Sequence, residues 1–382
     1  MKPIVVIGTG LAGFNTVKEL RKLNPDVPVV MLTHDDGRNY SKPMLSNGFA
    51  KGKDADGLAM GSAADTAANL KVDVRTGVEV VGIDRANKRL LLPDDHLDYD
   101  KLVLAMGATT WTPPLQGDAV GEVFSVNNLM DYDRFRKALA GKQKVLILGG
   151  GLIGCEFAND LVNGGFEVEL VEPQGRCLPL LLPQQASDAV AAGLSEAGVK
   201  FHFGPLAQGV NHGADGKLVT SLSDGSSVES DVVLSAIGLR PRIQLAQQAG
   251  LDVNRGIITD QFLRTSDADI FALGDCAEVN GHVLPFVLPL MAASRALAKT
   301  LAGEETAVSY GVMPVTIKTP ACPVVVIPVA ANEAGAWQVQ AEGRSVRAVF
   351  QGADGQLKGY ALTADAGKEK MQLNKELAPL MP

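Results

Sequence analysis

The sequence predicts an α/β protein made of two similar strand–turn–helix–strand units, followed by a small α+β domain at the C-terminal end. Three observations support this fold class. Glycine is frequent, with 41 of 382 residues, and it concentrates in two short clusters. Each cluster follows an apolar run and precedes an amphipathic segment. From about residue 304 the pattern changes to short β-rich runs. A chain of this length has room for two or three domains at roughly 100–200 residues each.

The first unit covers residues 3–33. An apolar run at residues 3–7 predicts a strand, and a glycine-rich turn at residues 8–13 leads into an amphipathic helix. Asn24-Pro25 predicts the end of this helix, because proline cannot continue it. The uninterrupted apolar run at residues 27–32 predicts a second strand that is buried on both faces, as in a parallel sheet.

The second unit repeats this order at residues 145–172. Residues 145–148 predict a strand, residues 149–154 a glycine turn, and the next segment a helix that ends near Val162. Residues 168–172 predict the closing strand. The repeat therefore indicates a duplicated domain rather than a short-period array.

Two further apolar runs, residues 102–108 and 232–238, each close on a glycine and predict buried strands. We expect the chain to leave and re-enter the first domain at these points. A helix is expected at residues 289–301, with Pro289 near its start and Gly303 beyond its end. The strands expected in the last domain lie at residues 315–318, 324–328, 347–350 and 357–362.

Charge and cysteine content exclude several classes of protein. The chain has 35 basic and 43 acidic residues, and its net charge of −8 argues against a nucleic-acid binder, because phosphate contacts need a basic surface. The four cysteines form no metal-binding spacing with the five histidines, so no metal site is predicted. Unclustered cysteines favour the reducing cytoplasm. The N-terminus lacks a signal-peptide pattern, and no apolar stretch approaches the ~20 residues that cross a bilayer.

Both glycine turns have the spacing Gly-x-Gly-x-x-Gly, which binds the pyrophosphate of a dinucleotide at the positive end of a helix. The first glycine permits a tight turn, the second lets the pyrophosphate approach the backbone, and the third lets the helix pack closely on the strand. One such motif is weak support. Two motifs, each between a strand and a helix, predict two Rossmann-like domains and two dinucleotides. The six glycines are Gly8, Gly10, Gly13, Gly149, Gly151 and Gly154.

The residue that ends the second strand of each unit indicates which nucleotide is bound. In the second unit this residue is Glu172. A carboxylate there accepts hydrogen bonds from ribose hydroxyls and repels a 2′-phosphate, so we predict NADH rather than NADPH. Arg176 is a nearby cation that argues weakly for the opposite choice. In the first unit the matching residue is Thr33, followed by His34 and two aspartates, so the ribose contact is less clearly specified.

Two more motifs give the sequence a family resemblance. Residues 265–275 match the pattern TxxxxxFAxGD, and residues 104–108 match an ATGA-like segment in which Met106 replaces threonine. Together with the two glycine turns, these motifs span residues 1–303 and resemble those of the two-dinucleotide flavoprotein reductases, the glutathione reductase-like group. The resemblance implies FAD as the first dinucleotide, with Asp275 holding its ribityl chain.

Three further segments resemble the rubredoxin reductases, an NADH-dependent branch of this group that supplies alkane hydroxylation. They are residues 40–46, 315–323 and 374–377. The resemblance implies an enzyme that passes electrons from NADH through FAD, one at a time, to rubredoxin, a small acidic iron protein. An alkane hydroxylase would be the final recipient.

The expected domains and contacts follow from the motifs and the resemblance. We expect an FAD-binding domain at residues 1–110 and 239–303, a NAD-binding domain at residues 111–238 and an α+β domain at residues 304–382. The expected FAD contacts are Gly8, Thr9, Gly10, Leu11, Ala12, Gly13, Thr33, His34, Lys42, Val80, Glu156, Asp275, Val287 and Lys318. The expected NAD contacts are Gly149, Gly151, Gly154 and Glu172.

The position of the first cysteine decides the route of the electrons. Disulfide reductases of the group place a reactive cysteine after the second strand, whereas this chain has Lys42-Pro43 there and no cysteine before Cys155. Electrons are therefore expected to leave the flavin directly. The sequence does not specify the oligomeric state, and the lack of a thiol shared between subunits is compatible with a monomer.

By resemblance, Lys42 reaches toward the flavin and pairs with Glu156, and we predict these two as the catalytic residues. A cation beside the ring stabilises the negative charge that develops on reduction, and a buried lysine needs a counter-charge. Lys318 is expected to supply a second cation near the same ring.

Other functions fit the same motifs. A related reductase of ferredoxin or flavorubredoxin, or an NADH oxidase, shares both glycine turns. A flavin-bearing redox-signalling protein, whose reduction changes its conformation or partner, is the non-enzymatic alternative. Rapid reduction of purified rubredoxin by NADH would separate the first prediction from the others.

Overall fold

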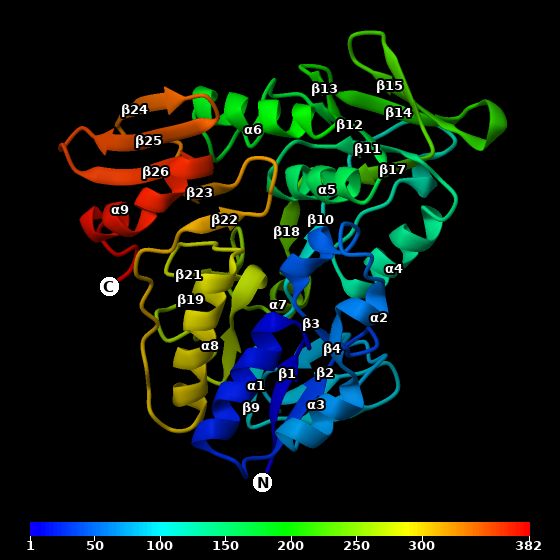
Figure 1. Cartoon of the computed structure of the whole chain (residues 1–382). Coiled ribbons are helices and arrows are strands. Elements are labelled where there is room, and N and C mark those ends of the chain that lie inside the picture. The colour runs from blue at the N-terminus through cyan, green and yellow to red at the C-terminus, as the bar shows by residue number, and fades with distance from the viewer.

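The computed structural model describes residues 1–382, which form three regions (Figure 1). Blue N-terminal segments and yellow segments from late in the chain meet in the lower region. Green segments form the upper region, and the orange and red C-terminal segments lie beside it. The predicted α/β fold class, with its α+β C-terminal part, is confirmed.

The lower region is built on a parallel sheet with the strand order β20-β9-β1-β2-β5. Ile4, at the start of β1, lies opposite Val29 on one side and Lys101 on the other. The strands are β1 (Ile4–Ile7), β2 (Val29–Leu32), β5 (Asp73–Arg75), β9 (Lys101–Leu104) and β20 (Ile270–Ala272). Since β20 comes late in the chain, the chain returns to this sheet after building the upper region.

Two long helices, α1 (Leu11–Leu23) and α8 (Val287–Leu301), lie side by side in the lower region (Figure 1). Helix α1 ends where Asn24 takes an extended conformation, as Asn24-Pro25 predicts. Helix α8 starts two residues before the expected position. Pro289 lies in its first turn, where a proline costs no helical hydrogen bond.

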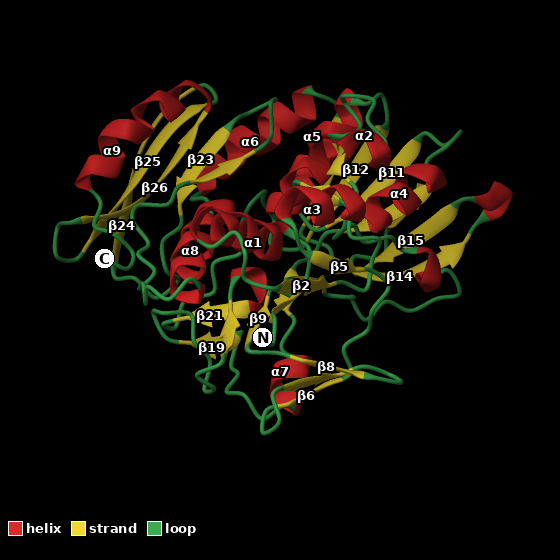
Figure 2. Cartoon of the chain, turned by 90° about the horizontal axis from the view of Figure 1, so that it is seen from below, coloured by secondary structure: helices red, strands yellow, loops and turns green.

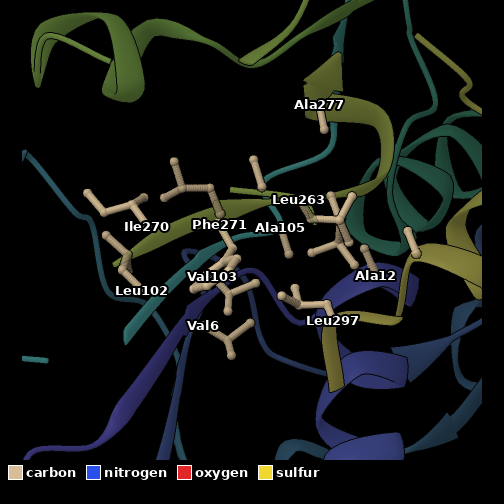
Figure 3. Close-up of a cluster of buried hydrophobic side chains, with 14 of the residues drawn as sticks. Val6, Ala12, Leu102, Val103, Ala105, Leu263, Ile270, Phe271, Ala277 and Leu297 are labelled. Atoms are coloured by element: carbon tan, nitrogen blue, oxygen red, sulfur yellow. The ribbon is translucent and has the colours of Figure 1, made fainter. Parts of the chain in front are cut away.

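The core of the lower region joins the sheet to both helices. Figure 3 shows Val6, Val103 and Phe271 from three neighbouring strands beside Leu297 of α8 and Ala12 of α1. Val103 and Leu297 have no solvent exposure. Burying each such side chain contributes about 1.5–3 kcal/mol, so this core fixes the carboxyl ends of the strands, where the first glycine turn lies.

The prediction of a single strand at residues 102–108 is wrong. Strand β9 ends at Leu104, the chain turns at Gly107 with φ +67°, and β10 (Ala108–Thr110) begins a separate pair. Strand β10 runs antiparallel to β18 (Leu239–Pro241). This two-stranded ladder joins the outgoing and returning connections between the lower and upper regions.

The upper region has a second parallel sheet, with the order β13-β12-β11-β17. Its strands are β11 (Lys144–Leu148), β12 (Glu167–Glu172), β13 (Val199–Phe203) and β17 (Val232–Ser235). Its helices are α4 (Leu129–Ala138), α5 (Leu152–Asn163) and α6 (Gln184–Glu196). An antiparallel ribbon of β14 (Ala207–His212), β15 (Leu218–Leu222) and β16 (Ser227–Ser230) follows. The sequence β11, α5, β12 therefore repeats β1, α1, β2.

The C-terminal region is an antiparallel sheet with the order β22-β23-β26-β25-β24. The strands are β22 (Val315–Ile317), β23 (Val324–Ile327), β24 (Gly335–Glu342), β25 (Ser345–Gly352) and β26 (Leu357–Thr363). They are followed by the 3-10 helix η5 (Ala364–Glu369) and by α9 (Lys370–Glu376). Strand β24 is not among the predicted strands, although Trp337 and Val339 alternate with polar residues and pack, partly buried, against the hydrophobic core.

The C-terminal sheet packs on α6 of the upper region. Val190 and Leu194 of α6 share a hydrophobic cluster with Val324 and Val346 of the sheet. Between them, a Cβ placed at Gly193 would lie 2.8 Å from the Ala321 carbonyl oxygen, so only glycine permits this approach. The third region is therefore fixed to the second through a common core.

Short elements complete the fold. Figure 2, seen from below, shows α7 (Gln244–Gln248) beside β6 (Gly82–Asp84) at the margin of the lower region. No helix in the structure combines the length and apolar character needed to cross a membrane. The other short helices are α2 (Ala55–Leu58), α3 (Ala63–Leu70), η1 (Lys42–Asn47), η2 (Val120–Glu122), η3 (Ala214–Gly216) and η4 (Gly274–Cys276). The other short strands are β3 (Asn39–Tyr40), β4 (Ala59–Gly61), β7 (Arg89–Leu91), β8 (His96–Asp98), β19 (Ile257–Thr259) and β21 (Ala277–Val279).

Candidate functional site

The first glycine turn joins β1 to α1 at the carboxyl edge of the lower sheet. Gly8 has φ +115°, and a Cβ there would lie 2.3 Å from the Ala105 carbonyl oxygen. A Cβ at Gly13 would lie 2.0 Å from the Gly8 carbonyl oxygen. At Gly10, by contrast, a Cβ would meet no protein atom within 4 Å. The outer glycines therefore serve packing within the protein, and the middle one leaves the backbone open to a ligand.

The second turn, between β11 and α5, has the same geometry. Gly149 has φ +101°, and a Cβ there would lie 2.9 Å from the Ala236 carbonyl oxygen. A Cβ at Gly154 would lie 1.9 Å from the Gly149 carbonyl oxygen, whereas Gly151 has no protein atom within 4 Å. Both turns thus have the arrangement that a pyrophosphate at a helix N-terminus requires.

Both turns open onto one continuous cavity of about 2200 Å³. Ligand pockets for one drug-sized molecule usually measure about 300–1000 Å³, so this cavity has room for two large ligands. Gly13 and Gly154 are not among its lining residues, because they pack beneath the turns. The predicted contacts that line it are Gly8, Thr9, Gly10, Leu11, Ala12, Thr33, His34, Lys42, Val80, Gly149, Gly151, Glu156, Glu172, Asp275, Val287 and Lys318.

Glu172 lies at the end of β12 with its carboxylate held by the backbone. Its Oε2 accepts a hydrogen bond from Gly150 N at 2.7 Å, and its Oε1 accepts one from Gln174 N at 2.8 Å. The remaining lone pairs are available to ribose hydroxyls in the cavity. Arg176 is not a lining residue and donates to the Pro179 carbonyl oxygen instead. Arg176 is therefore not placed to receive a 2′-phosphate beside Glu172.

The matching position of the first unit is built differently. Thr33 Oγ1 donates to Asp35 Oδ1 at 2.6 Å, and Gly37 N donates to the same oxygen at 3.0 Å. Asp35 lines the cavity. The carboxylate of this unit thus comes two residues after the strand-end position. The sequence showed Asp35 but gave no reason to choose it, since the spacing rule pointed to Thr33.

The predicted ion pair between Lys42 and Glu156 is wrong. Glu156 lies on α5 and is 3% exposed. Its Oε2 accepts from Ser46 Oγ at 2.6 Å and forms an ion pair with Lys318 Nζ, while its Oε1 accepts from Lys318 N at 2.9 Å. Lys318 follows β22, and the packing of the C-terminal sheet on the upper region brings it to α5. No sequence pattern relates these positions, which lie 162 residues apart.

Lys42 has a different partner. Its Nζ lies 3.5 Å from Asp275 Oδ2, and both side chains line the cavity. Lys42 begins η1, and Asp275 lies in η4 directly after β20. The cavity is therefore lined by two lysine–carboxylate pairs. Lys42 pairs with Asp275 of the lower region, and Lys318 pairs with Glu156 of the upper region.

The segment after η1 is tied to the upper region through Asp160 of α5. Its two carboxylate oxygens accept hydrogen bonds from Phe49 N at 2.9 Å and Ala50 N at 3.0 Å. Burial raises the pKa of Asp160 above its usual value. These contacts fix η1, and with it Lys42 and Ser46, against the second glycine helix. Sequence reasoning missed this positioning residue.

The four cysteines are all unpaired and buried, and none lines the cavity. Cys276, the residue after Asp275, donates from Sγ to the Leu104 carbonyl oxygen at 3.3 Å, and burial raises its pKa to about 11. A thiol with a raised pKa is a poor nucleophile. The cavity therefore offers no sulfur relay. No group of three or more metal-ligating side chains comes together in the structure.

Two pyrophosphate-binding turns that face one large cavity define a two-dinucleotide oxidoreductase. The residues fit FAD and a nicotinamide nucleotide. At Gly10 and Gly151 no side chain covers the backbone, so a pyrophosphate can approach each turn closely. The chain belongs to the pyridine nucleotide-disulphide oxidoreductase family, whose profile matches residues 2–300. Its cofactor is FAD, and NADH is its substrate. Residues 307–377 match a second profile, the rubredoxin binding C-terminal domain.

Individual relatives agree with this assignment. The chain is 73% identical to the rubredoxin-NAD(+) reductase of Alcanivorax borkumensis over 382 residues, covering 100% of both chains. It is 41% identical to the enzyme of the same name from Acinetobacter baylyi, covering 100% of this chain and 99% of the relative. Among solved structures, the ferredoxin reductase for the CYP199A2 system from Rhodopseudomonas palustris has a TM-score of 0.87 and 26% identity, covering 99% of this chain and 96% of that one.

Proposed function

We propose that this chain transfers electrons from NADH through FAD to rubredoxin, one electron at a time. One observation carries the proposal: both glycine turns and the C-terminal region line the same cavity. The C-terminal residues that do so are Met313, Pro314, Val315, Thr316 and Lys318. Residues 307–377, which match a rubredoxin-binding domain, therefore border the cavity that would hold the cofactor. An acceptor protein bound there could reach the cofactor.

We assign FAD to the first turn and NADH to the second. The FAD-binding domain would then comprise residues 1–110 and 239–303, the NAD-binding domain residues 111–238, and the third domain residues 304–382. FAD, when bound, accepts a hydride equivalent from NADH and releases its electrons singly. The protein positions the two ligands: each helix N-terminus offers backbone N–H groups to a pyrophosphate, and Glu172 accepts from the nicotinamide nucleotide's ribose.

The two lysines have distinct proposed roles. Lys318, whose side chain is 27% exposed, is held at the cavity wall by Glu156 and Ser46. Lys42, 32% exposed and paired with Asp275, is less constrained. A fixed positive charge favours negative charge developing on a reduced ring, so we propose Lys318 as the stronger electrostatic contributor. Glu156 keeps the ammonium group in place and offsets the cost of its burial.

With every cysteine buried away from the cavity, the acceptor must take electrons without a thiol intermediate. We propose a weak, salt-sensitive encounter with rubredoxin, as is usual for electron-transfer partners. The four unpaired cysteines also support a cytoplasmic location. An alkane hydroxylase as the final recipient stays a prediction from the family resemblance.

The experiment is a steady-state assay of the purified yellow protein with NADH, first with ferricyanide and then with purified rubredoxin. The proposal expects fast reduction of both acceptors and a much lower rate with NADPH. Fast ferricyanide reduction with no rubredoxin reduction would contradict the assigned acceptor and favour a flavorubredoxin or ferredoxin as partner. Slow turnover with every acceptor would favour a signalling role.

A further inference from the structure

Arg242 lines the same cavity, and its charge has no part in the function proposed above. It follows β18, and its backbone N–H donates to the Gly107 carbonyl oxygen at 3.0 Å. Its guanidinium forms no hydrogen bond or ion pair with any protein group, and its Nε is buried without a partner. No aspartate or glutamate occurs in residues 239–250 to act as a local counter-ion.

This arrangement indicates an acceptor from outside the chain. A guanidinium carries five N–H donors and is always charged, and buried donors in proteins are almost always paired. The flat fork of an arginine matches two oxygens of a phosphate or carboxylate. An arginine that faces a ligand cavity with no protein acceptor is therefore suited to an anionic ligand.

The surrounding backbone places Arg242 beside the first glycine turn. The carbonyl oxygen of Gly107, which accepts this hydrogen bond, belongs to the loop between β9 and β10. The Ala105 carbonyl oxygen of that loop is the atom that a Cβ at Gly8 would meet at 2.3 Å. Arg242 thus lies at the carboxyl edge of the lower sheet, where dinucleotide phosphates bind in open α/β sheets.

A second unpaired group lies at the same segment. Asn127 lines the cavity, donates from Nδ2 to the Ala108 carbonyl oxygen at 2.8 Å, and leaves its buried Oδ1 without a donor. Two orphaned polar groups therefore adjoin residues 107–108, one a donor and the other an acceptor. A ligand that carries both phosphates and hydroxyls would satisfy them.

We propose that Arg242 binds the pyrophosphate of FAD, opposite the backbone N–H groups of the first glycine turn. This inference rests on the assignment of FAD to that turn. Neither glycine motif includes Arg242. The residue lies far from both motifs in the sequence, in the segment where the chain returns to the lower region after β18. Its role would be to hold the cofactor, with no direct effect on the flavin ring.

The test compares Arg242→Gln and Arg242→Lys with the control Arg240→Gln. Arg240 carries the same charge two residues away but stacks over Trp111, with its Cζ 5.2 Å from the ring centroid. FAD release from each purified holoprotein is followed on dilution by the rise in flavin fluorescence. We expect the dissociation constant to rise about 10- to 100-fold for Arg242→Gln. A smaller rise is expected for Arg242→Lys, which keeps the charge but loses the fork. The control should match the wild type.

Two further readouts separate phosphate binding from other roles. With FAD in excess, Arg242→Gln should keep the wild-type flavin absorption spectrum, because the ring environment is unchanged. The salt dependence of FAD release should be shallower in Arg242→Gln, since one ionic contact is missing.

The outcomes that would overturn the inference are distinct. Unchanged FAD release in Arg242→Gln, or an equal loss in the Arg240→Gln control, would reject a specific phosphate contact. A weaker NADH affinity with normal FAD release would place Arg242 at the other dinucleotide. Wild-type protein that binds no FAD would overturn the proposed function itself, and this inference with it.

Discussion

The two glycine units share one backbone plan but hold their charged pairs differently. In the second unit, Glu156 is 3% exposed and pairs closely with Lys318. In the first, Asp275 and Lys42 are 18% and 32% exposed and lie 3.5 Å apart. Duplication of the fold therefore reproduces the phosphate-binding turn. The charged pairs beside each turn differ, because their lysines come from segments outside the duplicated units.

Removing the lysine from each pair should have unequal effects on stability. Lys318→Met leaves the Glu156 carboxylate buried without its counter-charge, which costs about 3–5 kcal/mol. Lys42→Met leaves Asp275, which is 18% exposed and lies 3.5 Å from the lysine, without this partner and should cost about 1 kcal/mol or less. Urea unfolding of both variants measures the difference. The double variant Lys318→Met/Glu156→Gln should recover part of the loss, and no recovery would show that the loss comes from packing.

The same glycine substitution should harm the first turn more than the second. At Gly8 a Cβ would meet backbone at 2.3 Å, against 2.9 Å at Gly149, and both residues have positive φ. Combining backbone strain and overpacking, Gly8→Ala should lower the free energy of unfolding by about 2–4 kcal/mol, and Gly149→Ala by less. Gly10→Ala is the matched control, because its Cβ meets no protein atom within 4 Å. Equal losses at all three positions would contradict this reading of the turns.

The strand-end carboxylates should separate the two ligands. Glu172→Ala removes the acceptor for the nicotinamide ribose, so the NADH dissociation constant should rise about tenfold or more while FAD stays bound. The preference for NADH over NADPH should shrink. Asp35→Ala should do the opposite, weakening FAD and leaving NADH affinity unchanged. Titrations of both nucleotides and of FAD release measure each effect, and a shared loss in both variants would argue against two separate ribose sites.

Acid should destabilise the second unit through Glu169 of β12, whereas β2 of the first unit has no charged residue. Burial opposes ionisation of Glu169, but Lys144, His202 and Lys200 together lower its pKa to about 2, from 4.5 in the unfolded chain. Its stabilising contribution is thus complete above pH 4.5 and is lost as the pH falls toward 2. Glu169→Gln should flatten the pH dependence of the melting temperature in this range, and an unchanged profile would exclude Glu169 as a cause.

The sequence predicted the units well because their rules are local. Apolar runs, Asn24-Pro25 and the glycine spacing act over a few residues, so α1 ends at Leu23 as expected. The prediction for residues 102–108 was less accurate. This apolar run contains a turn at Gly107, whose positive φ is not evident from the sequence. Strand β24 was missed although Trp337 and Val339 alternate with glutamines, the period-two pattern of a strand with one face toward a core.

The roles expected for the candidate-site residues stay predictions, and one expected ion pair among them is wrong. The expected cavity residues do share one cavity, apart from the two packing glycines. The partner of Glu156 was wrong, because Lys318 arrives only when the C-terminal sheet packs on α6. Asp160 and Arg242 were missed for the same reason: their roles depend on which distant backbone lies beside them, and no spacing rule encodes that.

We propose that electrons pass from the flavin to the acceptor without a sulfur intermediate. Stopped-flow spectroscopy tests it on native holoprotein treated with iodoacetamide at pH 8, after which excess reagent is removed. All four cysteines are buried, and burial raises the pKa of Cys276 to about 11. We therefore expect unchanged flavin reduction by NADH and unchanged reduction of rubredoxin. Normal flavin reduction followed by loss of rubredoxin reduction would contradict it.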